Sequence, residues 1–156
     1  MNLLDLNGNM TFNVKEVCDS FIIGSKIESR LNDLEIKTQF NNRDEILFKK
    51  VSIILSSRSP RSRLNAFRFI NEGKININKL DNLMKISWSV KLDNLHFLSF
   101  CSSLGLWVVI NLLSSINKIA LTGITLTFFL LFIYIGSFVI KIKMKDLVNM
   151  CVYKKR

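Results

Sequence analysis

Two long apolar runs in the C-terminal half constrain this chain more than any other feature of its sequence. They cover residues 95–117 and 119–140, and Lys118 is the only formal charge between Asp93 and Lys141. A helix rises about 1.5 Å per residue, so each run is roughly 33 Å long, whereas the hydrocarbon core of a bilayer is about 30 Å thick. A chain of 156 residues has too little other material to bury two such helices in a soluble core. We therefore expect a membrane protein.

The short turn between the runs predicts an antiparallel hairpin with both ends of the chain on one side of the membrane. The segment 141–156 carries six Lys or Arg and one Asp, while the turn contains a single lysine. By the positive-inside rule, both termini are predicted to be cytoplasmic and the protein to be a two-pass protein of the inner membrane. Lys141, Lys143 and Lys145 directly follow the second run, and we expect them to anchor the chain at anionic headgroups.

The sequence predicts three parts and a mainly helical chain overall. Residues 1–92 are expected to form a small cytosolic α+β domain. Residues 93–141 form the hairpin, with its helices at about 95–116 and 119–140. Residues 142–156 form a basic cytosolic tail.

Within the cytosolic domain, hydrophobic spacing and capping residues predict five elements. These are a helix at 14–31, a short strand at 34–40, a helix at about 44–55 that also has the pattern of a strand, a third helix with Ser59 as N-cap and Gly73 just past its end, and a β-hairpin at 74–92. This order resembles that of a winged-helix module, in which the third helix enters the major groove. The domain is therefore expected to be winged-helix-like.

The segment "SSRSPRSR" (56–63) opens the predicted third helix with a cluster of arginines. With Ser59 as N-cap and Pro60 at the first helical position, it reads as the first turn of an amphipathic helix. Arg58, Arg61, Arg63 and Arg68 are more cations than capping requires, so we expect them to contact phosphates. Lipid headgroups and DNA are both compatible with this pattern, with nucleic acid the less favoured partner.

Polar residues recur along one side of the first apolar run. At 100° per residue, they fall within about 120° of one another. The stripe consists of His96, Ser99, Ser103, Asn111 and Ser114. Such groups lack partners in lipid, so the stripe is expected to face protein or water. It serves either as helix-packing contacts or as the lining of a pore or a partner-binding groove in an oligomer.

The second run contains small residues suited to close approach of helices. Gly123, Thr127 and Gly136 are the positions expected to pack in this way.

Enzymatic motifs are not found in the sequence. The single histidine stands at the start of the first run, and no glycine-rich phosphate loop, metal-ligand cluster or nucleophile motif occurs. Cys18, Cys101 and Cys151 lack paired spacing and are expected to be reduced thiols. We therefore expect a protein without enzymatic activity, cofactor, metal or small-molecule substrate.

These observations favour an effector or regulator that acts through its transmembrane hairpin, either on membrane permeability or on a partner. Small exclusion, immunity and phage-defence proteins share this general architecture. The expected partners are the lipid bilayer and either further copies of the chain or another membrane protein. The alternatives are a membrane-tethered winged-helix regulator that binds DNA, and an accessory subunit of a larger membrane complex.

Overall fold

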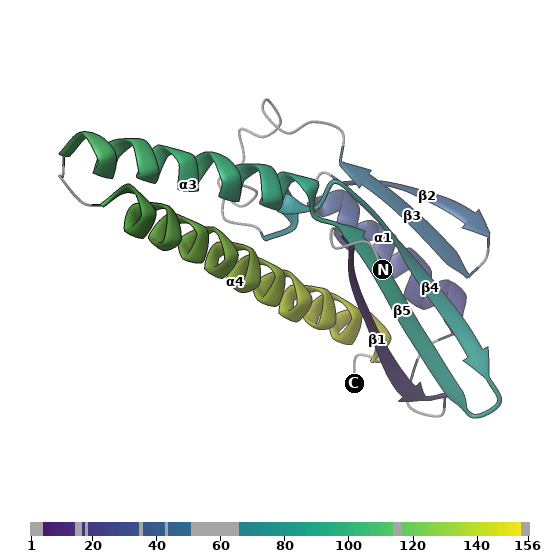
Figure 1. The fold of residues 1–156 in the computed structure, drawn as a ribbon. Helices are drawn as coiled ribbons and strands as arrows, with labels where there is room; N and C mark the ends of the chain where they lie inside the picture. The colour runs from purple at the N-terminus through teal and green to yellow at the C-terminus, as the bar shows by residue number, and fades with distance from the viewer. Residues whose placement is uncertain are drawn as a thin grey trace.

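The computed structural model describes residues 5–14, 17, 19–34, 36–42, 44–50, 66–113 and 117–153. In chain order, its elements are β1 (Asp5–Asn13), α1 (Ser20–Asp33), β2 (Ile36–Asn42), β3 (Glu45–Lys50), η2 (Ala66–Phe69), β4 (Glu72–Leu80), β5 (Leu83–Lys91), α3 (Asp93–Leu113) and α4 (Lys118–Val152). The chain folds as a small N-terminal α/β domain followed by two long apolar helices, α3 and α4 (Figure 1).

The five strands form one antiparallel sheet in the order β1, β5, β4, β3, β2. A two-residue turn at Asp81 and Asn82 joins β4 to β5, and Asp81 has a φ of 49°. Aspartate tolerates this left-handed conformation better than most residues, which suits it to a tight hairpin turn. The predicted β-hairpin at the end of the domain is confirmed, with Ile75 opposite Trp88 in the register.

One face of the sheet carries the hydrophobic core and packs against α1 and the last part of α4 (Figure 1). Alternation along β5 places Ile86, Trp88 and Val90 on this face, while their neighbours in sequence point the other way. From α1, Ile27 and Leu31 complete the core at helical spacing. The opposite face of the sheet is left uncovered by the described helices.

α4 is much longer than a bilayer requires. Its 35 residues extend roughly 52 Å, while the hydrocarbon core is about 30 Å thick. The first part of α4 pairs with α3, and the last part enters the α/β domain, where Val148 and Val152 are fully buried. Tyr153 then forms an isolated β-bridge with Val17. The predicted boundary at 141 therefore does not coincide with a structural break, because 142–152 belong to both the helix and the domain core.

Several predicted elements of the domain are wrong. The first helix begins at Ser20 rather than at Val14, and residues 5–13 form a strand that the sequence pattern did not predict. The helix predicted at 44–55 is wrong over residues 45–50, which form β3, the strand alternative. Gly73 does not end a helix, because it lies inside β4.

These errors have one physical cause, the pairing of strands distant in sequence. β1 contains three Asn and one Gly among its nine residues, which are poor strand formers, yet it pairs with β5 along its full length. In β3, Ile46 and Phe48 are buried while Leu47 is exposed, which is the period of a strand rather than of a helix. The winged-helix-like prediction is wrong for the same reason, since the domain is built on a five-stranded sheet. The start of the predicted third helix lies outside the described residues.

Candidate functional site

α3 and α4 form an antiparallel hairpin (Figure 1) and contact each other, and the residues buried along the hairpin include small and polar ones. Ser99 of α3 is fully buried, and its hydroxyl donates a 2.6 Å hydrogen bond to the carbonyl oxygen of Leu95. Gly136 of α4 lies beside Leu95, because a Cβ at position 136 would be only 2.6 Å from Leu95 Cδ1. The small residue at 136 therefore allows the two helices to approach closely.

Farther along the hairpin, Ser103 and Thr125 lie in an open groove between the helices. Both residues are only 7% exposed, and Trp107 and Phe129 also line the groove, whose volume is about 500 Å³. The Thr125 hydroxyl donates to the carbonyl oxygen of Leu121, 3.1 Å away, in its own helix. Ser103 Oγ has no hydrogen-bond partner within the described part of the chain. In apolar surroundings, an unpartnered hydroxyl costs free energy.

The rest of the predicted polar stripe does not share this interface. His96 is half-buried at the start of α3, with its Nδ1 2.8 Å from the carbonyl oxygen of Leu92. Asn111 is exposed, two residues before α3 ends. Ser114 lies outside the described residues. Of the predicted stripe, therefore, only Ser99 and Ser103 are buried within the hairpin among the described residues.

Gly123 and Thr127, the other predicted packing positions, lie on the exposed side of α4. A Cβ at Gly123 would have no neighbour within 4 Å, and the Thr127 hydroxyl donates to the carbonyl oxygen of Gly123 at 2.9 Å. The two helices of one hairpin are therefore not packed through these residues. Their side of α4 is left uncovered within the described part of the chain.

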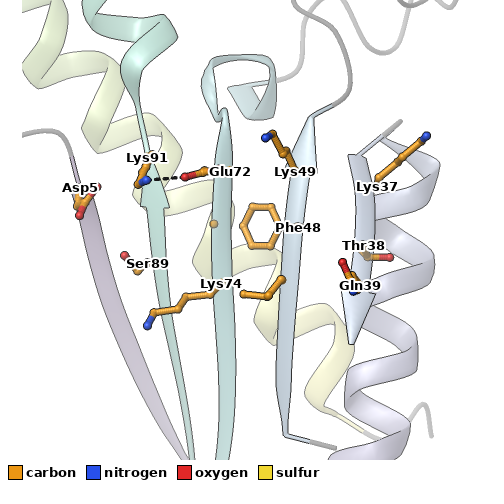
Figure 2. A pocket seen from close by; sticks show the side chains of 12 residues that line it. Asp5, Lys37, Thr38, Gln39, Phe48, Lys49, Glu72, Lys74, Ser89 and Lys91 are labelled. Carbon is orange, nitrogen blue, oxygen red and sulfur yellow. Dashed lines mark hydrogen bonds and ion pairs between the residues drawn. The ribbon is translucent and has the colours of Figure 1, made fainter. Parts of the chain in front are cut away.

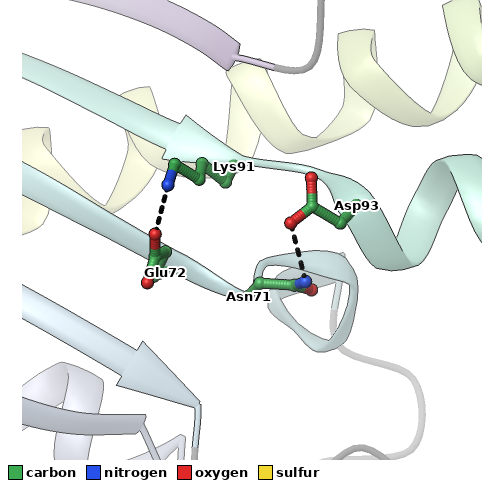
Figure 3. A network of polar contacts seen from close by, with 4 residues as sticks. All are labelled: Asn71, Glu72, Lys91 and Asp93. Carbon is green, nitrogen blue, oxygen red and sulfur yellow. Dashed lines mark hydrogen bonds and ion pairs between the residues drawn. The ribbon is translucent and has the colours of Figure 1, made fainter.

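Four polar residues connect the sheet to the start of α3 (Figure 3). Lys91 at the end of β5 forms an ion pair with Glu72, and this hydrogen bond lowers the pKa of the Glu72 carboxyl and raises the pKa of the Lys91 ammonium. Asn71 Nδ2 donates to Asp93 Oδ2 at 3.2 Å. A carboxylate such as Asp93 in the first turn of a helix complements the helix dipole. The Asn71–Asp93 hydrogen bond therefore links the start of α3 to the residue before β4, while the ion pair links β4 to β5.

The uncovered face of the sheet carries charged and polar side chains in rows that run across the strands. In sheet order from β1 to β2, the register partners nearest α3 are Asp5, Lys91, Glu72, Lys49 and Lys37. The next outward-facing row is Asn7, Ser89, Lys74, Leu47 and Gln39. In the first row, acidic and basic residues alternate from β1 to β3. Lys49 of β3 and Lys37 of β2, by contrast, are both basic and lie opposite each other.

All residues of these two rows except Asn7 line an open hollow of about 710 Å³ (Figure 2). The helices lie behind the sheet in this view, so the hollow faces away from the hydrophobic core. Lys37, Lys49 and Lys74 reach it from three neighbouring strands, and all three are exposed. We call the space lined by these three residues the lysine hollow.

The other predicted cationic positions lie near the hairpin or outside the described residues. Lys141, Lys143 and Lys145 are exposed on α4 at the point where the helix passes from the hairpin to the domain. Arg68 belongs to η2, a turn that packs against α4 and α3. Arg58, Arg61 and Arg63 lie outside the described residues, so their predicted contacts with phosphates stay predictions.

Comparison of the chain with protein-family models, with curated proteins and with solved structures gave no match. Among the residues that the structure describes, no group of three or more His, Cys, Asp or Glu side chains is placed to hold a metal ion.

Sequence reasoning missed the lysine hollow because its residues come from separate strands that only the sheet register brings together. One signal for it was present. Lys37 and Gln39 alternate with core-facing residues in the predicted strand at 34–40, which places them on the outer face.

Proposed function

We propose that this chain is a two-pass protein of the bacterial inner membrane, with both termini in the cytoplasm and a non-enzymatic regulatory or effector role. Two helices long and apolar enough to cross a membrane support this proposal, since only 17% and 11% of their most apolar windows are buried. Phe97, Leu112 and Ile119 are 70%, 77% and 82% exposed. The core helices of a soluble protein would have the opposite distribution.

The continuity of α4 is the observation that carries the regulatory role. One uninterrupted helix links the apolar hairpin to the core of the α/β domain, where Met144 and Val148 are fully buried. Packed cores resist continuous deformation, so a shift of α4 along or about its axis requires the domain to repack. An event at the domain would reach the membrane by the same helix.

Between the permeability and partner-binding versions of this role, the geometry favours partner binding. Ser99 and Ser103 are buried within the hairpin and are not available to line a pore, so Asn111 is the exposed member of the predicted stripe among the described residues. The exposed surface of the hairpin includes the small residues Cys101, Gly105 and Gly123, and a Cβ added at either glycine would have no neighbour within 4 Å. Small residues allow membrane helices to approach closely. We propose that this surface contacts a second hairpin, in an exclusion, immunity or phage-defence setting.

Cross-linking in the membrane tests the contact between hairpins. In a chain that retains Cys101 but has Cys18 and Cys151 replaced by serine, mild oxidation should produce a disulfide-linked dimer. Gly105→Leu, one helical turn from Cys101, should reduce its yield, because the added side chain separates the helices. Purification in mild detergent would show whether another membrane protein takes the place of the second copy. Absence of both the dimer and a co-purifying membrane protein would refute the partner-binding role.

The permeability version has a separate test. If hairpins assemble into a pore, induction of the chain should lower the membrane potential, and Asn111→Leu should restore it. An unchanged potential with both chains would exclude a pore. The DNA-binding alternative was based on a winged-helix fold, which the structure does not have. The accessory-subunit alternative would be identified by the same detergent purification.

A further inference from the structure

We propose that the lysine hollow binds the phosphate groups of a small phosphorylated molecule, which acts as a ligand of the α/β domain. Binding at this site does not depend on how the hairpin acts in the membrane. Only the further step, in which the ligand regulates the hairpin through α4, rests on the proposed function.

The arrangement of charge points to an anion. Lys37 and Lys49 are direct cross-strand partners on the same face, and like charges in this position repel each other. Lys74 lies one outward-facing row farther along the neighbouring strand β4. Within the described part of the chain, none of these three lysines has a carboxylate at ion-pair distance, and Glu72 is already paired with Lys91. A phosphate in the hollow would attract all three lysines and offset the repulsion between Lys37 and Lys49.

The shape and lining of the hollow favour a small molecule over a nucleic-acid strand. Its volume of about 710 Å³ is within the range of roughly 300–1,000 Å³ that is usual for small-molecule sites. Ser89 and Gln39 offer hydrogen bonds to a polar ligand, and Leu47, 37% exposed, offers an apolar contact. Sheets that bind single strands stack the bases on aromatic side chains. Among the described residues that line the hollow, the one aromatic side chain is Phe48, and at 2% exposure it offers no surface on which a base could stack.

Titration of the purified full chain in a neutral detergent tests the site, with ATP as the probe in the absence of divalent cations. Calorimetry should detect binding of ATP and none of adenosine, which lacks the phosphates. Lys37→Gln and Lys74→Gln should each weaken ATP binding about tenfold, the usual effect of losing a hydrogen bond to a charged group. Lys85→Gln is the matched control, because Lys85 is exposed on the same face opposite Thr11, near the far end of the sheet. It should bind ATP as the unmodified chain does.

A gain of affinity provides the sharpest evidence, because misfolding cannot produce it. Glu72 lies beside Lys49 in the register and repels an incoming phosphate. Glu72→Gln should therefore tighten ATP binding several-fold at low salt. The site would be refuted if ATP did not bind at millimolar concentration, if adenosine bound equally well, or if Lys85→Gln weakened binding as much as Lys37→Gln.

Phosphate groups on lipids are the competing occupant of the hollow, and lipid composition distinguishes them. The same titration is repeated in nanodiscs of phosphatidylcholine, with and without phosphatidylglycerol. If the ligand is a soluble molecule, the affinity for ATP should change by no more than a few-fold when phosphatidylglycerol is added. If phosphatidylglycerol instead lowers the affinity for ATP more than tenfold, and does not do so in the Lys37→Gln chain, the lysines bind lipid headgroups and the proposal is overturned.

Discussion

At position 73, the absence of a side chain decides how closely β3 and β4 can pack. The ring of Phe48 lies across Gly73, so a Cβ there would be 2.5 Å from Phe48 Cζ and 2.7 Å from the carbonyl oxygen of Ser89. A ring can turn aside, but the carbonyl belongs to the paired strand and cannot move without breaking the register. Gly8 has the same relation to the ring of Trp88. Two aromatic side chains of the core thus depend on glycines of neighbouring strands.

Gly73→Ala should lower the free energy of unfolding by about 1–3 kcal/mol, the usual cost of overpacking a core. Thermal or denaturant unfolding of the purified chain would measure the loss. Gly105→Ala is the control, because a Cβ at that position meets nothing within 4 Å and alanine favours a helix. Equal stability of the two variants would contradict the packing described for Phe48.

The ion pair between Lys91 and Glu72 should contribute to stability near neutral pH and lose its contribution in acid. Because the native-state pKa of Glu72 is lowered, its contribution is present above the unfolded-state pKa and disappears as the pH falls through the native-state pKa. Both side chains are substantially exposed, at 49% and 39%, so the contribution is small. The unfolding midpoint of Glu72→Gln should therefore be slightly below that of the unmodified chain at pH 7, and the difference should shrink as the pH falls through the native-state pKa of Glu72. A difference that persists in acid would show that Glu72 acts through something other than its charge.

At the scale of elements, the sequence predicted what depends on local pattern and missed what depends on distant pairing. Both apolar helices, α1 in part, β2 and the β4–β5 hairpin follow from runs and alternations within a single segment. β1 could not be predicted, because its polar sequence forms a strand only by pairing with β5, far along the chain. The lysine hollow and the burial of the last part of α4 could not be predicted either, because both depend on residues that are distant in sequence. Met144, Leu147 and Cys151 have the spacing of a buried stripe, but charges around them indicated a solvated tail.

A break in α4 between the hairpin and the domain tests the role of that helix. Lys143 is exposed, so Lys143→Ala should leave the structure intact, whereas Lys143→Pro interrupts the helix at a cost of about 3 kcal/mol. Cys151 is 1% exposed, and burial raises the pKa of its thiol, so it should react slowly with maleimide in the unmodified chain. In chains with the other two cysteines replaced, Lys143→Pro should accelerate labelling of Cys151 and Lys143→Ala should not. Equal rates in all three would mean that the end of α4 is not held in the domain core.

For the whole molecule, one continuous helix joins the α/β domain to the apolar hairpin. The Asn71–Asp93 hydrogen bond links the start of α3 to the sheet, and the last part of α4 returns to the core of the same domain. The hairpin is therefore attached to the domain at both of its ends. This double attachment would allow the domain and the hairpin to respond to each other, and the proposed role requires the hairpin to cross the bilayer twice.

The position of Lys118 relative to the membrane tests this central claim most directly. Lys118 stands at the start of α4, at the tip of the hairpin, and Lys85 lies in the sheet. In cells that express cysteine-free chains with Lys118→Cys or Lys85→Cys, a membrane-impermeant maleimide is added before and after the inner membrane is opened. We predict that Lys118→Cys is labelled while the inner membrane is intact and that Lys85→Cys is labelled only after it is opened. Labelling of both positions only after opening would show that the hairpin does not cross the membrane.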